Sequence, residues 1–171
     1  TYNRWQCWPH SVPNPERLNE DGCRRLIWWE AMAGGMGGFF GHFSDRFNAY
    51  GPFNPKGPCG YHPNSLKQSF RTYREFWKHG RLKLNMRPNN NRVSGAKGYC
   101  LASACKQYFV FFIEEADSVT LNLNEMPGKM PMIAVDAKAE YAEIPKGEFT
   151  AGIHTIQLDS KSDWAIAIGE F

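Results

Sequence analysis

An apolar stripe with helical periodicity runs through residues 65–79. The spacing of Ser65 and Gln68 is that of a capping box, which closes the first turn of a helix. Gly80 stands where a helix commonly ends in the left-handed backbone conformation. The pattern therefore predicts an amphipathic helix, and its apolar face consists of Leu66, Phe70, Tyr73 and Trp77.

A second helical pattern begins near Asn14 and Pro15, because Asn favours the N-cap and Pro favours the first helical position. It runs to about Ala33, with a break expected near Gly22, and glycines at 34 and 35 end it. Residues 38–43 then form a short, continuously apolar run, which is typical of a strand that is buried on both faces in a parallel sheet. Residues 44–63 are rich in Gly, Pro and Asn and predict a long loop.

The pattern changes after Asn89, where short runs of β-forming residues alternate with turn residues. About seven such strands predict a small antiparallel β-sandwich. The chain is accordingly expected to be α+β, with an incomplete α/β part at 1–87 and a β-sandwich at 88–171. The main predicted strands are 98–103, 107–114, 118–124, 132–137, 139–144, 152–158 and 164–170.

Composition narrows the functional classes. The 171 residues have a formal net charge of +3, and the basic residues do not cluster, so nucleic-acid binding gets no support. Arginines 24, 25, 71, 74 and 81 are spread along the two predicted helices, and we expect them on solvated or salt-bridged faces. No run approaches the roughly 18 apolar residues of a membrane span, so no membrane partner is expected.

Two Cys-x-x-His units lie in Pro-rich sequence, and three interpretations of them stay open. A tetrahedral zinc site takes two thiolates and two imidazoles, which these units together contain. The alternatives are unrelated loop residues or a disulfide between the two cysteines. The residues are Cys7, His10, Cys59 and His62.

Four segments together resemble the C-terminal end of (β/α)8-barrel glycoside hydrolases that have an appended β-sandwich, and among these the apiosidase-like group. Residues 25–35 resemble the helix after the seventh barrel strand, and residues 37–42 resemble the eighth strand. Residues 69–79 resemble the last barrel helix. Residues 162–168, which begin Ser-Asp-Trp, resemble the strand that closes the sandwich.

This resemblance implies that the catalytic residues lie outside the chain. Retaining glycosidases use two carboxylates about 5 Å apart, and in barrels of this kind they end strands four and seven. Because the chain begins after the seventh strand, we assign no catalytic residue. The same chemistry needs neither a cofactor nor a metal. The 171 residues alone are expected to be inactive.

Five residues are candidates for substrate binding if the barrel is present. His42 ends the predicted eighth strand, on the side where barrels place their active sites. The aromatic candidates suit stacking on sugar rings. For each of them a structural or solvated role is the alternative. The candidates are His42, Trp5, Trp8, Asp45 and Tyr50.

The sequence thus predicts the C-terminal fragment of a glycoside hydrolase that acts on poly- or oligosaccharides. Its partners would be the carbohydrate substrate and the missing N-terminal part of the barrel. The resemblance implies an extracellular or periplasmic location. The alternative is a non-catalytic carbohydrate- or protein-binding sandwich with a helical cap.

Overall fold

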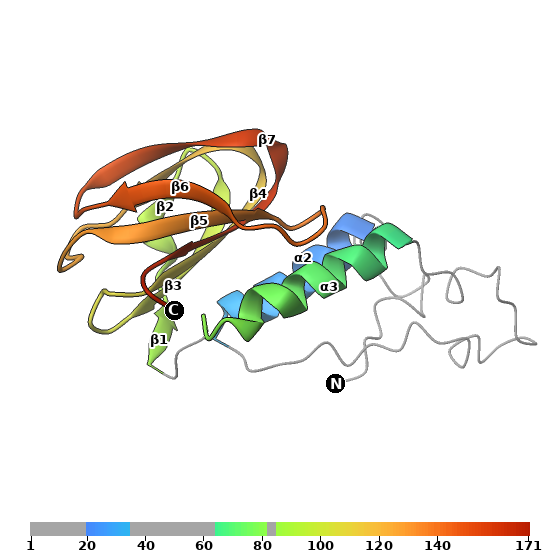
Figure 1. Ribbon diagram of the computed structural model, residues 1–171, viewed down its shortest axis with the longest axis horizontal. Coiled ribbons are helices and arrows are strands. Elements are labelled where there is room, and N and C mark those ends of the chain that lie inside the picture. The colour runs from blue at the N-terminus through green and yellow to red at the C-terminus, as the bar shows by residue number, and fades with distance from the viewer. Residues whose placement is uncertain (1–19, 35–63, 82–84) are drawn as a thin grey trace, which may run out of the picture.

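The computed structural model describes residues 20–34, 64–81 and 85–171, which form two helices and one connected sheet (Figure 1). The predicted α+β class is confirmed. In chain order the elements are α2 (Glu20–Met32), α3 (Asn64–Lys78), β1 (Met86–Pro88), the 3-10 turn η3 (Asn90–Arg92), β2 (Val93–Ser94), β3 (Lys97–Ser103), β4 (Phe109–Asn122), β5 (Met130–Asp136), β6 (Ile144–Phe149) and β7 (Ile153–Ile168).

Both helices end as the sequence predicts. Gly34 follows α2 with φ +81°, and Gly80 follows α3 with φ +68°. A glycine adopts this left-handed conformation without the Cβ clash that other residues meet. The start of the first predicted helix, before residue 20, lies outside the described residues, as does the predicted strand at 38–43.

The sheet is antiparallel, and its strand order is β1-β3-β4-β7-β5-β6, with β2 paired to β4. Its two longest strands, β4 and β7, pair with each other along two stretches. Residues 109–113 of β4 pair with 164–168 of β7, and residues 118–122 pair with 153–157. The register shifts between these stretches, where Glu115 has φ +48°.

Several predicted strand boundaries are wrong. The runs at 107–114 and 118–124 belong to the single strand β4, because the polar residues between them form a bulge instead of a turn. The runs at 152–158 and 164–170 are likewise one strand, β7. The strand predicted at 139–144 is largely a loop, because the Asp136 side chain accepts the backbone N–H of Lys138 (2.8 Å) and begins a turn.

The central strands are buried on both faces. In β4, Phe109, Phe111 and Ile113 point into a core enclosed by the sheet, and the alternate residues Val110 and Phe112 point toward the helices. β7 follows the same alternation, with Trp164 in the first core. This two-sided burial confirms the prediction that the apolar run 107–114 is a central strand and that Trp164 is a core residue.

Trp28 is the centre of the second core, between the helices and the sheet. Its fully buried ring lies parallel to the Phe112 ring, with centroids 5.0 Å apart and planes at 2°. Tyr73 and Phe76 of α3 meet it edge-on at 5.0 and 5.3 Å. The packing role predicted for Trp28 is therefore confirmed, and the helices share a core with the sheet.

α2 and α3 lie side by side and run in the same direction, as the colour gradient along each helix shows in Figure 1. Their contacts follow this direction, because Trp28 in the second half of α2 touches Tyr73, Phe76 and Trp77 in the second half of α3. The proposed division into 1–87 and 88–171 stays a prediction. β1, which spans that boundary, pairs with β3.

Replacing Trp28 by alanine should destabilise the chain by about 3–5 kcal/mol, because a large buried side chain would leave a cavity in the helix–sheet core. Urea unfolding measures the loss. Ile153→Ala is the control, since Ile153 is 67% exposed and its truncation should change the free energy of unfolding by less than about 0.5 kcal/mol. Equal effects of the two substitutions would contradict the central role of Trp28.

Candidate functional site

Two groups of polar residues lie where the helices meet the sheet, and Asp163 is the centre of the first. Asp163 is completely buried on β7. Its Oδ2 accepts hydrogen bonds from Arg24 Nη2 (2.7 Å), Arg24 Nε (3.1 Å) and Arg25 Nε (3.1 Å). Its Oδ1 accepts Arg25 Nη2 and the backbone N–H of Glu115, each at 3.0 Å. One carboxylate thus ties α2 to β7 and to the bulge of β4.

Further acidic groups neutralise the two arginines. Asp21, one turn before Arg24, also accepts its guanidinium, and Arg25 Nη2 donates to Glu115 Oε1 at 2.8 Å. Burial raises the pKa of Asp163, but the hydrogen bonds from Arg25 and Arg24 lower it by more, so this pKa lies below its usual range. The charged form of Asp163 is therefore the form that the fold stabilises.

Glu114 connects the same region to the aromatic residues of the interface. Its Oε1 accepts the indole N–H of Trp29 at 2.6 Å, and its Oε2 accepts Lys97 Nζ at 2.8 Å. The Lys97 ammonium also lies 5.2 Å from the centre of the Trp29 ring, within cation–π range. Glu114 is nearly buried and engaged at both oxygens, which fits a structural carboxylate and not a general acid.

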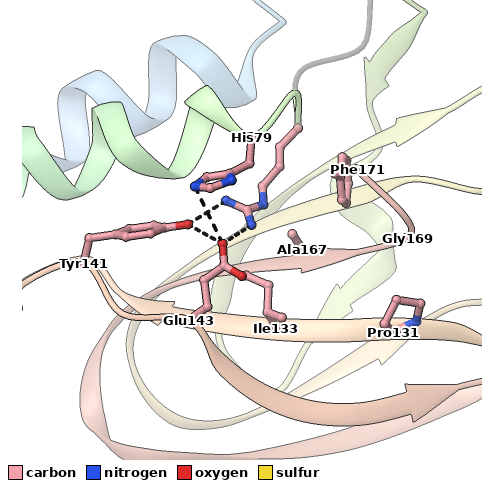
Figure 2. Close-up of a pocket in the computed structure, with 9 residues that line it drawn as sticks. His79, Pro131, Ile133, Tyr141, Glu143, Ala167, Gly169 and Phe171 are labelled. Carbon is pink, nitrogen blue, oxygen red and sulfur yellow. Dashed lines mark hydrogen bonds and ion pairs between the residues drawn. The ribbon is translucent and has the colours of Figure 1, made fainter.

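The second polar group lines a cavity of about 370 Å³ at the C-terminal end of α3 (Figure 2). The strands β5 and β7, the loop between β5 and β6, and the last residues of the chain complete its wall. Figure 2 shows His79, Tyr141 and Glu143 on one side and Phe171 and Pro131 on the other. The lining residues are His79, Arg81, Pro131, Ile133, Tyr141, Glu143, Ala167, Gly169 and Phe171.

Glu143 is the acceptor around which the polar side of this cavity is arranged. Its Oε1 accepts hydrogen bonds from the Tyr141 hydroxyl and from Arg81 Nη2, and His79 Nε2 lies 4.0 Å away. Arg81 is buried, and its Nη1 donates to the Phe76 carbonyl (2.7 Å) and to Tyr141 Oη (3.0 Å). The His79 and Tyr141 rings are stacked, with centroids 5.8 Å apart.

The acidity of these groups follows from their partners. Burial raises the pKa of Glu143, but the hydrogen bonds from Tyr141 and Arg81 outweigh it and leave this pKa below its ordinary value. Burial and the hydrogen bond to Glu143 raise the pKa of Tyr141. At neutral pH the cavity therefore holds an ionised Glu143 and a protonated Tyr141.

All five predicted substrate-binding residues, His42, Trp5, Trp8, Asp45 and Tyr50, lie outside the described residues, so they stay predictions. The same holds for the possible zinc ligands Cys7, His10, Cys59 and His62. In the part of the chain that the structure describes, no group of three His, Cys, Asp or Glu side chains could hold a metal ion. No helix among those residues is long and apolar enough to cross a membrane.

Sequence reasoning missed both polar groups. Of the five arginines expected on solvated or salt-bridged faces, four form ion pairs, namely Arg24, Arg25, Arg74 and Arg81. Two of these, Arg24 and Arg81, are buried. The strand predicted at 139–144 includes Tyr141 and Glu143. Their spacing of two residues, which puts both on one side of an extended segment, was the available signal. Nothing local indicated that Arg81 would be their partner.

The solved structures with a similar fold include two glycoside hydrolases. One, described as a glycoside hydrolase, superposes on 89% of this chain with a TM-score of 0.67 at 15% sequence identity. The other is the crystal structure of a glycoside hydrolase family 5 protein from Bacteroides vulgatus ATCC 8482, which covers 94% of this chain with a TM-score of 0.68 at 18% identity. At these identities the likeness concerns the fold.

This chain spans only 37% and 38% of the lengths of those two proteins. No protein-family model matches the sequence, and a search of curated proteins found no match.

Replacing Asp163 by asparagine should destabilise the chain by about 3–5 kcal/mol at pH 7, because two guanidinium groups would face a neutral amide at a buried site. Thermal or urea unfolding measures the change. Asp159→Asn is the matched control on the same strand. Asp159 is 55% exposed and pairs with Lys146 at the surface, so its replacement should change the free energy by about 1 kcal/mol or less.

The stability difference should depend on pH. A carboxyl group whose pKa is depressed in the folded chain stabilises the fold above its unfolded pKa of about 3.9, and this contribution disappears as pH falls through the lower folded value. The Tm of the unmodified chain should therefore fall more steeply below about pH 4 than that of Asp163→Asn. If the Tm of the two proteins changes equally with pH, the ionisation of Asp163 does not account for the loss of stability in acid.

Proposed function

We propose that the chain is the C-terminal part of a carbohydrate-hydrolysing enzyme, in which α2 and α3 are neighbouring outer helices of a (β/α)8 barrel. The sheet of residues 86–168 would be an accessory β-sandwich held against those helices. The fold similarity to two glycoside hydrolases, each more than twice as long, supports this assignment. The narrower assignment to the apiosidase-like group rests on the sequence motifs alone.

The parallel direction of α2 and α3 is the observation on which the proposal rests (Figure 1). Two helices joined by a short loop pack antiparallel. When two neighbouring helices run in the same direction, the chain between them must travel back along the full length of a helix. In α/β folds this connecting segment is commonly a strand. Successive helices around a parallel barrel run in the same direction, so the parallel direction of α2 and α3 supports the proposal.

The intervening sequence is suitable for such a strand. Helices of 13 and 15 residues are about 20–22 Å long at about 1.5 Å per residue. The apolar run 38–43 would extend about 20 Å as a strand, which matches the return distance. In this arrangement His42 ends the strand at the face where barrels place their active sites.

The described residues would anchor the barrel and not perform its chemistry. The buried carboxylates Asp163 and Glu114 are saturated by arginine, lysine and tryptophan donors, so neither is available to protonate a glycosidic oxygen. A two-carboxylate mechanism would draw both groups from upstream of Thr1. His42, Trp5, Trp8, Asp45 and Tyr50 would contact the carbohydrate substrate.

The coding sequence upstream of Thr1 provides the first test. It should encode a strand that ends in Glu within about 20 residues, because one βα unit of a barrel takes about 30 residues in all. A start codon or an unrelated linker at that place would contradict the proposal.

Hydrolysis provides the second test, with 4-nitrophenyl glycosides and a panel of plant polysaccharides as substrates. The longer chain encoded by the gene should release sugar, and the 171-residue chain should stay at the uncatalysed rate because it lacks both carboxylates. A Glu→Gln variant at the upstream strand end is the control for a contaminating activity. Hydrolysis by the 171 residues alone would refute the proposal. An inactive longer chain that binds glycans would instead favour the non-catalytic binding module.

A further inference from the structure

The cavity at the end of α3 has the composition of a small-molecule site. Its apolar lining includes Ile133, Ala167 and Phe171, whereas its polar groups lie on one side, from His79 to Glu143 (Figure 2). Binding cavities for small molecules have this character, with a mostly apolar wall and a few oriented polar groups. The cavity is distant in sequence from every residue for which we predict substrate contact.

The charges in this cavity favour a neutral ligand. Arg81 and Glu143 neutralise one another, and both Nη atoms of Arg81 are already engaged by Phe76, Tyr141 and Glu143. A phosphate or carboxylate would therefore find no free guanidinium fork and would face the Glu143 charge. An ammonium group would face the Arg81 charge. An anion therefore gains no partner without breaking the existing pair, and an ammonium group could reach the second Glu143 oxygen only close to the Arg81 charge.

Two groups in the cavity, the second carboxylate oxygen of Glu143 and the imidazole of His79, can bind the hydroxyl groups of a ligand. Glu143 Oε2 makes no hydrogen bond to the described part of the chain, because Tyr141 and Arg81 both bind Oε1. The side chain of Glu143 is 34% exposed and that of His79 is 51% exposed. A hydroxyl group can donate to the carboxylate oxygen and can also form a hydrogen bond with the imidazole ring of His79. Adjacent hydroxyls of a polyol suit this pair.

The size and the apolar part of the lining suit a small ligand such as one sugar ring. The volume of about 370 Å³ is near the lower end of the range for ligand sites. The C–H face of a sugar ring would meet Ile133, Ala167 and the Phe171 ring, while its hydroxyls would meet Glu143 and His79.

We propose that this cavity binds a single neutral pyranoside unit, with Glu143 and His79 contacting its hydroxyls and Ile133, Ala167 and Phe171 contacting its apolar face. The polyol chemistry follows from the cavity, and the choice of a pyranoside among polyols rests on the proposed glycoside hydrolase function. For a half-open site with a ligand of this size, the dissociation constant should be about 1 mM.

An NMR titration of the 171-residue chain tests the proposal. The probes are methyl β-D-glucopyranoside, methyl β-D-xylopyranoside and methyl β-D-galactopyranoside, each raised to about 50 mM, well above the expected dissociation constant. At least one should produce saturable shifts at the backbone amides of Ala167 and Gly169. Inositol, inorganic phosphate and methylamine are the comparison probes. Tighter binding of inositol than of the glycosides would refute the choice of a pyranoside. Tighter binding of phosphate or methylamine would refute the claim that the ligand is neutral.

Matched variants locate the binding. Glu143→Gln should weaken it about fivefold, because a hydrogen bond to a charged acceptor is roughly twice as strong as a neutral one. His79→Ala should weaken it about threefold, and this exposed position should tolerate the change without loss of fold. The controls are Glu148→Gln and His154→Ala. Glu148 is an exposed carboxylate on β6, and the ring of His154 bonds the Thr150 carbonyl. Both variants should bind the glycoside with the affinity of the unmodified chain.

Two results would overturn the proposal. One is the absence of saturable shifts at the cavity with all three glycosides. The other is binding that Glu143→Gln and His79→Ala leave unchanged, because the sugar would then occupy another surface. Either result leaves the hydrolase assignment intact, since that assignment is decided by the upstream sequence and by hydrolysis.

Discussion

The buried ion pairs between Asp163 and the two arginines of α2 are the constraint on which the rest of the structure depends. A buried carboxylate is strongly unfavourable unless cations and hydrogen bonds surround it, and Asp163 has five donors within 3.1 Å. These donors come from α2 and from the bulge of β4, so one carboxylate links the helix to both long strands of the sheet. The stacked Trp28 and Phe112 rings then add buried apolar area to this interface, while the ion pairs set the orientation of α2 on the sheet.

The cavity depends on the same arrangement. α2 and α3 pack together through Trp28 and the aromatic residues of α3, so fixing α2 on β7 also places the end of α3 beside β5. Thr72 then donates to the Ala139 carbonyl at 2.7 Å, and the loop from 137 to 143 lies along the helix. Arg81 meets Tyr141 and Glu143 as a result. A structural anchor at one end of the interface thereby forms a polar cavity at the other.

Local interactions made the helices predictable. The stripe of Phe70, Tyr73 and Trp77 and the glycine at 80 act within one or two helical turns, and the structure has a helix from Asn64 to Lys78 with that cap. The strand pairing was less predictable. Residues 115–117 have the composition of a turn, because three polar or small residues separate the two predicted strands, yet Glu115 forms a bulge and its N–H binds Asp163. A distant carboxylate decided between turn and bulge.

The sequence by itself determined the periodicity of α3, the glycine ends of both helices, the two-sided burial of the first half of β4 and the α+β class, because each follows from interactions between residues close in the chain. Only the tertiary structure decided which charges are paired and where the cavity lies. Arg24 and Asp163 are 139 residues apart, and Arg81 and Glu143 are 62 apart. Any arginine is chemically able to pair with any carboxylate, so the choice depends on the packing of α2 and α3 against the sheet, which no local pattern encodes.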